Sequence, residues 1–458
     1  MICGSTTYYL SAKEKDFLQR ASLFLNSYPF YLFLLFLSCF FVSFRLEVLG
    51  AIVFAVLISF ILVICDDFIP ALLPFLLLST FVTNCYDSFS TFMRYAVFFP
   101  LPVVAIFYHF IYYKKPFSSG ESVKGIFSVS VAITLGGIGS FSIKNYLFGA
   151  YYFLGLGAGM LGLYFCIRSQ LFPKRRYDER MRFALIMTIV GSLCSYMVIA
   201  GYSLFFAHKT VQPYLLGFSR NNLSTILMFA MPFPLYLGEK RRGVEGFTVL
   251  FYASICLTTS RGGLIFGSIE FLFCCAYWIF QGPHKKVRWA RFTLCLVSIT
   301  VVFALCGTVA SKVFLHRIIK GAVVLKDPRW TMIKEAVSRF EKNPFVGTGI
   351  LDNTTTYASF KKAGTMSWYH MMIPQIIGSM GAIGLACYFY QFWGRIKLAL
   401  KNYNSWSICL GVSYLGILMM SQVNPGEFCP IPFEFLTVIL FIFQEKRLEQ
   451  SKILPIAK

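Results

Sequence analysis

The sequence predicts an all-α membrane protein, a polytopic helix bundle of about 12–14 transmembrane helices with one large extracytoplasmic loop. Two observations support this prediction. Apolar residues make up 57% of the chain and charged residues only 14%, whereas a soluble domain carries about 25% charged residues. The apolar residues also gather into runs of about 17–25 residues, which is the length that a helix needs to cross a bilayer.

The apolar windows that qualify as spans occupy most of the chain. In the first half they lie at 28–44, 47–65, 68–84, 92–113, 123–140 and 145–167, and in the second half at 183–207, 221–238, 245–260, 261–280, 291–310, 368–392, 405–423 and 428–444. The windows 245–260 and 261–280 abut so closely that we expect them to form a hairpin. We divide the chain into N-terminal transmembrane helices (1–207), central transmembrane helices with arginine-bearing outer turns (208–310), the large loop (311–367) and C-terminal transmembrane helices (368–458).

The net charge of +22 would suggest a nucleic-acid partner in a soluble chain. Here the basic residues instead cluster in alternate short loops: Arg168, Lys174, Arg175, Arg176, Arg180 and Arg182; Lys240, Arg241 and Arg242; Lys285, Lys286, Arg288 and Arg291; Arg395, Lys397 and Lys401. The opposite short loops, such as 141–144 and 424–427, carry almost no positive charge. Under the positive-inside rule this pattern places both termini in the cytoplasm. We expect no nucleic-acid partner.

One polar stretch, from Ser311 to Ser367, interrupts the apolar windows. Long loops escape the positive-inside rule, so its arginines do not argue against a position outside the membrane. Counting spans from the basic loops places this stretch on the extracytoplasmic side. It leads directly into a span that begins Trp368-Tyr369-His370, and we expect it to border the functional site.

The chain contains 14 cysteines but no pair with the C-x-x-C spacing of zinc and redox sites. Most of them lie inside apolar windows, where cysteine behaves as a small hydrophobic residue. Asp66 and Asp67 fall on the predicted cytoplasmic side, and we interpret them as a cap for the next helix. We expect no metal and no cofactor.

Arg261 is the strongest candidate for a binding residue. It lies in the tight turn of the predicted hairpin, between Ser260 and the paired glycines Gly262 and Gly263. The small residues let the backbone turn sharply and expose N–H groups at a helix start. A guanidinium group at that place suits phosphate oxygens, so the turn predicts an anion site at the outer face.

Two further residues are expected at the same face. Arg220 stands at the mouth of a span, where the alternative is an ordinary arginine that extends its charge to the membrane surface. His370 stands at the outer end of the span that follows the polar stretch. Histidine takes up a proton near neutral pH, as a general base must. His316, within the polar stretch, is a weaker candidate for that role.

Glu270 and Glu434 lie inside predicted spans. An ionisable group in the bilayer is costly and usually functional. Either glutamate can pair with an arginine of the bundle, and the sequence does not choose the partner.

Four stretches of the chain resemble the O-antigen ligase and O-antigen polymerase family of bacterial integral-membrane glycosyltransferases. They are Ser219-Arg220-Asn221-Asn222 before a span with Met231-Pro232, Thr259-Ser260-Arg261-Gly262-Gly263-Leu264, Arg329-Trp330 leading into Asn343-Pro344-Phe345-Val346-Gly347-Thr348-Gly349, and His370 with the run from Gly378 to Gly384. The resemblance covers about 210 to 390. Met371 follows the histidine, where the family often has asparagine.

The resemblance implies a metal-independent enzyme of the bacterial cytoplasmic membrane. Such enzymes use an undecaprenyl-diphosphate-linked oligosaccharide as donor and a glycan or lipid as acceptor, at the outer face. By position, Arg220 and Arg261 match the family's diphosphate-binding arginines and His370 matches its catalytic histidine, and we add Arg329 as a third diphosphate ligand. Membrane lipids, a flippase and chain-length regulator proteins are the other expected partners.

Three functions remain open from the sequence. The first is a polymerase of surface polysaccharide repeats, such as O-antigen, capsule or exopolysaccharide. The second is an O-antigen ligase that transfers glycan to lipid A core or another acceptor, and it uses the same outer arginines. The third, a transporter or flippase of lipid-linked sugars, is less favoured because the halves show no internal repeat and the polar residues gather at one face.

Overall fold

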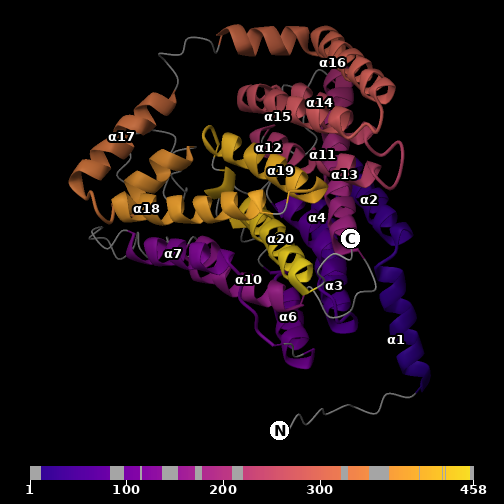
Figure 1. Ribbon diagram of the computed structural model, residues 1–458, viewed down its shortest axis with the longest axis vertical. Helices are drawn as coiled ribbons and strands as arrows, with labels where there is room; N and C mark the ends of the chain where they lie inside the picture. The colour runs from indigo at the N-terminus through magenta and orange to yellow at the C-terminus, as the bar shows by residue number, and fades with distance from the viewer. Residues whose placement is uncertain are drawn as a thin grey trace.

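The structure, a computed structural model, describes residues 12–82, 97–113, 116–136, 153–170, 178–208, 220–320, 328–349, 371–401, 403–424, 426–428 and 430–453. These residues are mostly helical, and no strand occurs among them (Figure 1). In lipid every backbone polar group needs a partner within the protein, and a helix supplies these partners within one segment. The predicted all-α membrane bundle is confirmed.

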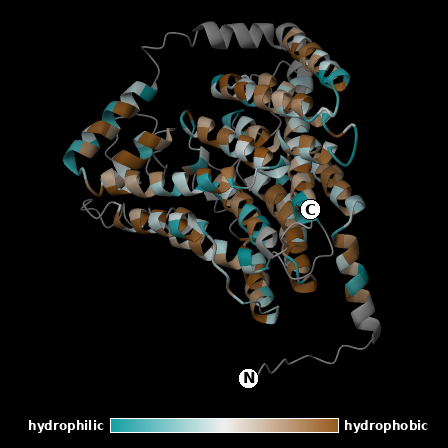
Figure 2. Ribbon diagram, in the orientation of Figure 1, coloured by the Kyte–Doolittle hydropathy of each residue, from teal (hydrophilic) through white to brown (hydrophobic). Residues whose placement is uncertain are grey.

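Five helices in the described ranges are long and apolar enough to cross a membrane individually: α3 (Glu47–Ile64), Glu179–Ser203 within α11 (Glu179–His208), α15 (Arg261–Phe280), Lys285–Ala304 within α16 (Lys285–Lys320) and α18 (Met372–Leu400). The bent pair of α1 (Ala12–Leu25) and α2 (Tyr28–Ser43) adds a sixth if it forms one span. Brown apolar residues recur along most of the helices in Figure 2. The figure of 12–14 spans stays a prediction.

The remaining helices are shorter. They are α4 (Ile69–Val82), α6 (Pro100–Tyr112), α7 (Ser122–Leu135), α10 (Ala158–Gln170) after the π-helix η2 (Phe153–Gly157), α12 (Arg220–Ala230), α13 (Phe233–Gly238), α14 (Gly246–Leu257), α17 (Pro328–Lys342), α19 (Ser405–Ser421) and α20 (Phe435–Ile453). The predicted hairpin is confirmed as α14 and α15, where the rings of Tyr252 and Phe271 stack with centroids 4.2 Å apart.

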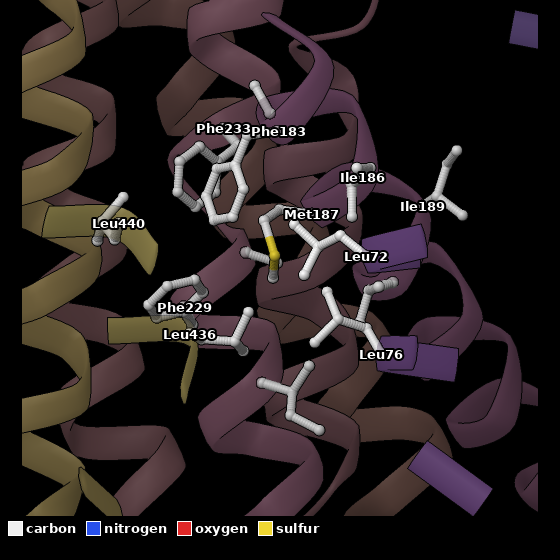
Figure 3. Close-up of a cluster of buried hydrophobic side chains, with 14 of the residues drawn as sticks. Leu72, Leu76, Phe183, Ile186, Met187, Ile189, Phe229, Phe233, Leu436 and Leu440 are labelled. Atoms are coloured by element: carbon white, nitrogen blue, oxygen red, sulfur yellow. The ribbon is translucent and has the colours of Figure 1, made fainter. Parts of the chain in front are cut away.

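Helix α11 lies at the centre of the bundle. Figure 3 shows Phe183 and Met187 of α11 among side chains from four other helices, namely Leu72 and Leu76 of α4, Phe229 of α12, Phe233 of α13, and Leu436 and Leu440 of α20. Phe183 and Met187 are fully buried. Lipid tails are as apolar as these side chains, so close packing rather than water exclusion holds the helices together. This core fixes α12, which carries part of the candidate site.

One span is broken at Met231-Pro232, between α12 and α13. Proline cannot donate the backbone hydrogen bond that continues a helix, and two carbonyl groups near the break accept hydrogen bonds from side chains of neighbouring helices. Ser413 Oγ donates to Phe229 O at 2.8 Å, and Thr248 Oγ1 donates to Met231 O at 3.0 Å. These bonds tie α12 to both α19 and α14.

Helix α18 is also interrupted, at Gly381, where φ is 62° and ψ is −154°. The segment that follows α17 enters the break: Thr348 N donates to Gly378 O at 3.1 Å, and Ala382 N donates to Pro344 O at 2.8 Å. A Cβ atom on Gly381 would lie 2.6 Å from the carbonyl carbon of Phe345. The Asn-Pro-x-x-Gly-x-Gly segment and the glycine-rich run therefore have a structural role, since each completes the backbone hydrogen bonds of the other.

Replacing Gly381 with alanine is expected to destabilise the fold by about 3 kcal/mol or more, because the backbone conformation is one that only glycine adopts readily and the new methyl group meets backbone atoms. The control is Gly394→Ala in the same helix. A Cβ atom there meets nothing within 4 Å, so it should leave stability unchanged or raise it. The unfolding temperature of purified protein measures both. Equal unfolding temperatures for the two variants would contradict the role assigned to the break.

Between α19 and α20 the chain folds through the 3-10 helix η5 (Gly426–Phe428) and the π-helix η6 (Pro430–Glu434). Glu427 and Phe428 are buried, and the Phe428 ring lies against Tyr388 with centroids 5.9 Å apart. Irregular backbone is tolerated at membrane depth only when protein surrounds it. The predicted span 428–444 thus begins as a buried irregular segment.

The polar stretch differs from an unbroken loop. Helix α16 continues through residues 311–320, and α17 forms within the stretch.

Asp67 caps α4 as the sequence predicts, because its Oδ1 accepts the Ile69 N–H at 3.0 Å before that helix. Its other oxygen forms an ion pair with Arg182 at 3.0 Å.

Candidate functional site

The site begins at the turn between α14 and α15. Thr259 adopts a positive φ of 56°, and Ser260 is extended and caps α15 by accepting the Gly263 N–H at 3.2 Å. Capping leaves Arg261 as the first residue of the helix, with an exposed side chain. Arg220 likewise opens α12 and is half-buried.

Hydrogen bonds join these two helix starts. Ser260 Oγ donates to Asn221 Oδ1 at 2.8 Å, and Ser224 Oγ lies 2.7 Å from Thr258 Oγ1. A Cβ atom on Gly263 would lie 2.7 Å from Ser224 Oγ, so glycine is needed for this close approach. The structure therefore brings the first turn of α12 against the turn that carries Arg261.

The end of α19 connects a third arginine to this place. Arg329 Nη2 donates to Val423 O at 2.9 Å. Asn424 Nδ2 donates to Asn222 Oδ1 at 3.2 Å, and a Cβ atom on Gly262 would lie 2.5 Å from the Val423 side chain. Segments that carry Arg220, Arg261 and Arg329 thus meet around Val423 and Asn424, although they lie far apart in the sequence.

The sequence analysis missed Val423 and Asn424, because it treated 424–427 only as a short loop without positive charge. The available signal was Asn424 itself, a polar side chain directly after an apolar window.

His370 lies outside the described residues, one position before Met371, and the side chain of His316 is also outside them. The role of His370 remains a prediction.

Comparison with known families adds independent information. Residues 246–389 match the family model described as O-antigen ligase. This segment belongs to the O-antigen ligase family. It includes Arg261, Arg329 and His370, while Arg220 and Asn424 lie outside it. A search of the curated proteins found no match. The chain is a multi-pass membrane protein, and the matched segment supports a glycan-transferring enzyme of the ligase and polymerase class.

The bundle interior also holds a buried ion cluster that we call the Arg395 cluster: Arg395 of α18, Glu427 of η5 and Glu434 of η6. Arg395 Nη2 lies 2.7 Å from Glu434 Oε1, and Arg395 Nη1 forms an ion pair with Glu427. All three side chains are buried. Glu434 therefore has an arginine partner, as the sequence allowed. Glu427 was not predicted from the sequence, because residues 424–427 were expected to form a short outer loop rather than part of the buried interior.

Glu270 has no such arginine partner among the residues that the structure describes. Its side chain is fully buried in α15, and neither carboxyl oxygen has a hydrogen-bond partner there. A Cβ atom on Gly416 of α19 would lie 2.3 Å from Glu270 Oε2. Glycine at that position thus makes room for the carboxyl group between α15 and α19.

The opposite ends of the same helices carry the basic loops. Glu239, after α13, accepts a hydrogen bond from Tyr277 Oη near the end of α15 at 2.8 Å. Lys240 Nζ lies 2.9 Å from Asp178 Oδ2. The basic loop at 240–242 therefore lies at the opposite end of the bundle from the arginines that open α12 and α15.

Proposed function

We propose that this protein transfers a glycan from a polyprenyl-diphosphate donor at the outer face of the cytoplasmic membrane, and that it polymerises surface polysaccharide repeats. The observation that carries the proposal is the meeting of the segments bearing Arg220, Arg261 and Arg329 around Val423 and Asn424. Guanidinium groups stay charged at all relevant pH values and match the geometry of phosphate oxygens.

The chemistry follows from the charge that develops during transfer. The acceptor hydroxyl oxygen forms a bond to the sugar C1, and the bond from C1 to the diphosphate oxygen breaks. The electron pair leaves with the polyprenyl diphosphate, where fixed positive charges stabilise it. In this proposal Arg220, Arg261 and Arg329 supply those charges. His370 takes the proton of the acceptor hydroxyl, and no metal takes part.

The sidedness rests on the positive-inside rule. The basic loop at 240–242 lies at the opposite end of the bundle from Arg261, which supports a cytoplasmic position for that loop and an outer position for the arginines. Both termini are then cytoplasmic. Nucleotide sugars are absent outside the cell, so a lipid-linked donor fits this location, with a flippase to deliver it and a chain-length regulator as a further partner.

An O-antigen ligase is the second candidate, since the matching family model is the ligase model. Glycan from a strain that lacks the gene separates the two functions. A single unpolymerised repeat on the final acceptor is expected for a polymerase. Free lipid-linked chains would instead assign a ligase.

The direct test is purified protein with a defined lipid-linked donor, with product size and linkage as the readout. Glycan transfer is expected for the wild type, and its rate is expected to fall at least about a hundredfold, the size given by loss of one charge-stabilising group, with Arg261→Ala or His370→Ala. If transfer kept its wild-type rate after both changes, the transferase assignment would have to be abandoned, and a transporter would become the better hypothesis.

A further inference from the structure

We propose that Asn221 and Asn222 are further ligands of the donor's diphosphate, with their amide N–H groups directed to it by Ser260 and Asn424. This inference rests on the proposed function, because it concerns the same site. Both asparagines directly follow Arg220 in the first turn of α12, and both are half-buried.

Ser260 fixes the orientation of the Asn221 amide. Its Oγ accepts the Gly263 N–H at 3.2 Å and lies 2.8 Å from Asn221 Oδ1. A carbonyl oxygen can only accept, so the single hydrogen of the serine hydroxyl must point to Asn221. One lone pair of Asn221 Oδ1 is thereby used, and the bond orients the amide so that the Nδ2 group keeps both of its hydrogens to bind a ligand.

Asn424 acts on Asn222 in the same way. Its Nδ2 donates to Asn222 Oδ1 at 3.2 Å, and its own side chain is buried. Asn424 is held in turn, because its N–H donates to Met420 O at 2.9 Å. Among the described residues we find no acceptor for the Nδ2 groups of Asn221 or Asn222. Both amides therefore present donors rather than acceptors.

The arrangement favours an anion with several oxygens as the ligand. Two amides offer two N–H donors each, and they stand beside Arg220 and the turn that carries Arg261. A sugar hydroxyl both donates and accepts, whereas each of these carbonyl oxygens already accepts one hydrogen bond and the amides offer mainly donors. Phosphate oxygens only accept, and bonds to charged oxygens are the stronger kind. The ligand class is a diphosphate.

The test titrates undecaprenyl diphosphate into the purified full-length protein in nanodiscs of neutral phosphatidylcholine. Asn221→Ala is expected to weaken binding about tenfold, because one bond to a charged group is lost. Asn221→Asp has nearly the same shape but presents a carboxylate to the phosphates, and is expected to weaken binding about a hundredfold. The matched control is Asn404→Asp, which caps α19 through Ser407 N elsewhere and should bind like the wild type.

Ser260 is a positioning residue in this proposal. Ser260→Ala is expected to weaken binding by about threefold to tenfold, since the Asn221 amide loses the bond that orients it. Ser260→Thr keeps the hydroxyl group and should restore the affinity. Because Ser260 also caps α15, the unfolding temperature is measured alongside. Loss of stability without loss of affinity would contradict the positioning role.

Two competitors test whether the ligand is a diphosphate. The Arg261→Ala variant separates this inference from the proposed function. Inorganic pyrophosphate should compete with undecaprenyl diphosphate, whereas phosphatidylglycerol added to the nanodiscs should not; equal competition by phosphatidylglycerol would overturn a diphosphate ligand. If Arg261→Ala weakens binding but Asn221→Asp and Asn221→Ala do not, this inference is wrong and the proposed function stands. If Arg261→Ala binds like the wild type, the proposed function itself fails.

Discussion

Replacing Arg261 with alanine is expected to lower the rate of glycan transfer by about 10²–10³-fold, as removal of one group that stabilises developing negative charge does in other enzymes. Arg261 opens α15 with an exposed side chain, so stability should change little. A lysine at this position keeps the charge but loses the planar fork that binds two oxygens. Arg261→Lys should therefore recover only part of the rate, which is measured with purified protein and a lipid-linked donor.

The matched control for Arg261 is Arg242→Ala. Arg242 is also exposed, but it lies in the basic loop at the opposite end of the bundle. Its removal is expected to leave the transfer rate within about twofold of the wild type, because surface charges beyond a Debye length of about 8 Å are largely screened. Equal losses of rate in the two variants would show that total positive charge matters rather than the site.

The second large effect concerns the Arg395 cluster. Replacing both Glu427 and Glu434 with glutamine is expected to destabilise the protein by about 3–5 kcal/mol, because the Arg395 guanidinium is left buried without a counter-charge. Either single change leaves one carboxylate to pair with Arg395 and is expected to cost only about 1 kcal/mol. The free energy of unfolding is measured in the same detergent for the wild type, the two single variants and the double variant.

A third substitution tests whether the uncompensated charge of Arg395 causes the loss of stability. Adding Arg395→Met to the double variant removes the uncompensated charge and fills a similar volume, so most of the lost stability should return. If the loss of unfolding free energy in the double variant equals the sum of the two single losses, the two glutamates do not share one arginine. Because Glu427 follows Asn424 by three residues, the double variant should also weaken the site that Asn424 supports.

The interior of the bundle is more polar than the sequence analysis predicted. The sequence predicted only Glu270 and Glu434 within the spans, and the structure adds Arg395 and Glu427 to the buried polar residues of the bundle. The span of α12 and α13 is also broken at Pro232. Such features also occur in transporters, and the O-antigen ligase family match of residues 246–389 favours the transferase.

The sequence by itself determined the fold class, because 57% apolar residues in long runs fit no other environment. It also identified the hairpin turn at Arg261 and the cap at Asp67, since both depend on residues close together in the chain. Local features of this kind follow from the conformational preferences of glycine, serine and aspartate. The basic loops gave an expected orientation in the same way.

Only the tertiary structure decided how distant segments combine. Val423 and Asn424 join the segments of three arginines, and Arg395 was found to pair with both Glu427 and Glu434. The interlock of the 343–349 segment with the break at Gly381 is of the same kind. Hydropathy and spacing report which residues lie on one helix, but the partner of a side chain depends on how helices pack. For that reason the sequence predicted which arginines belong to the site, and the helix packing showed which residues bring their segments together.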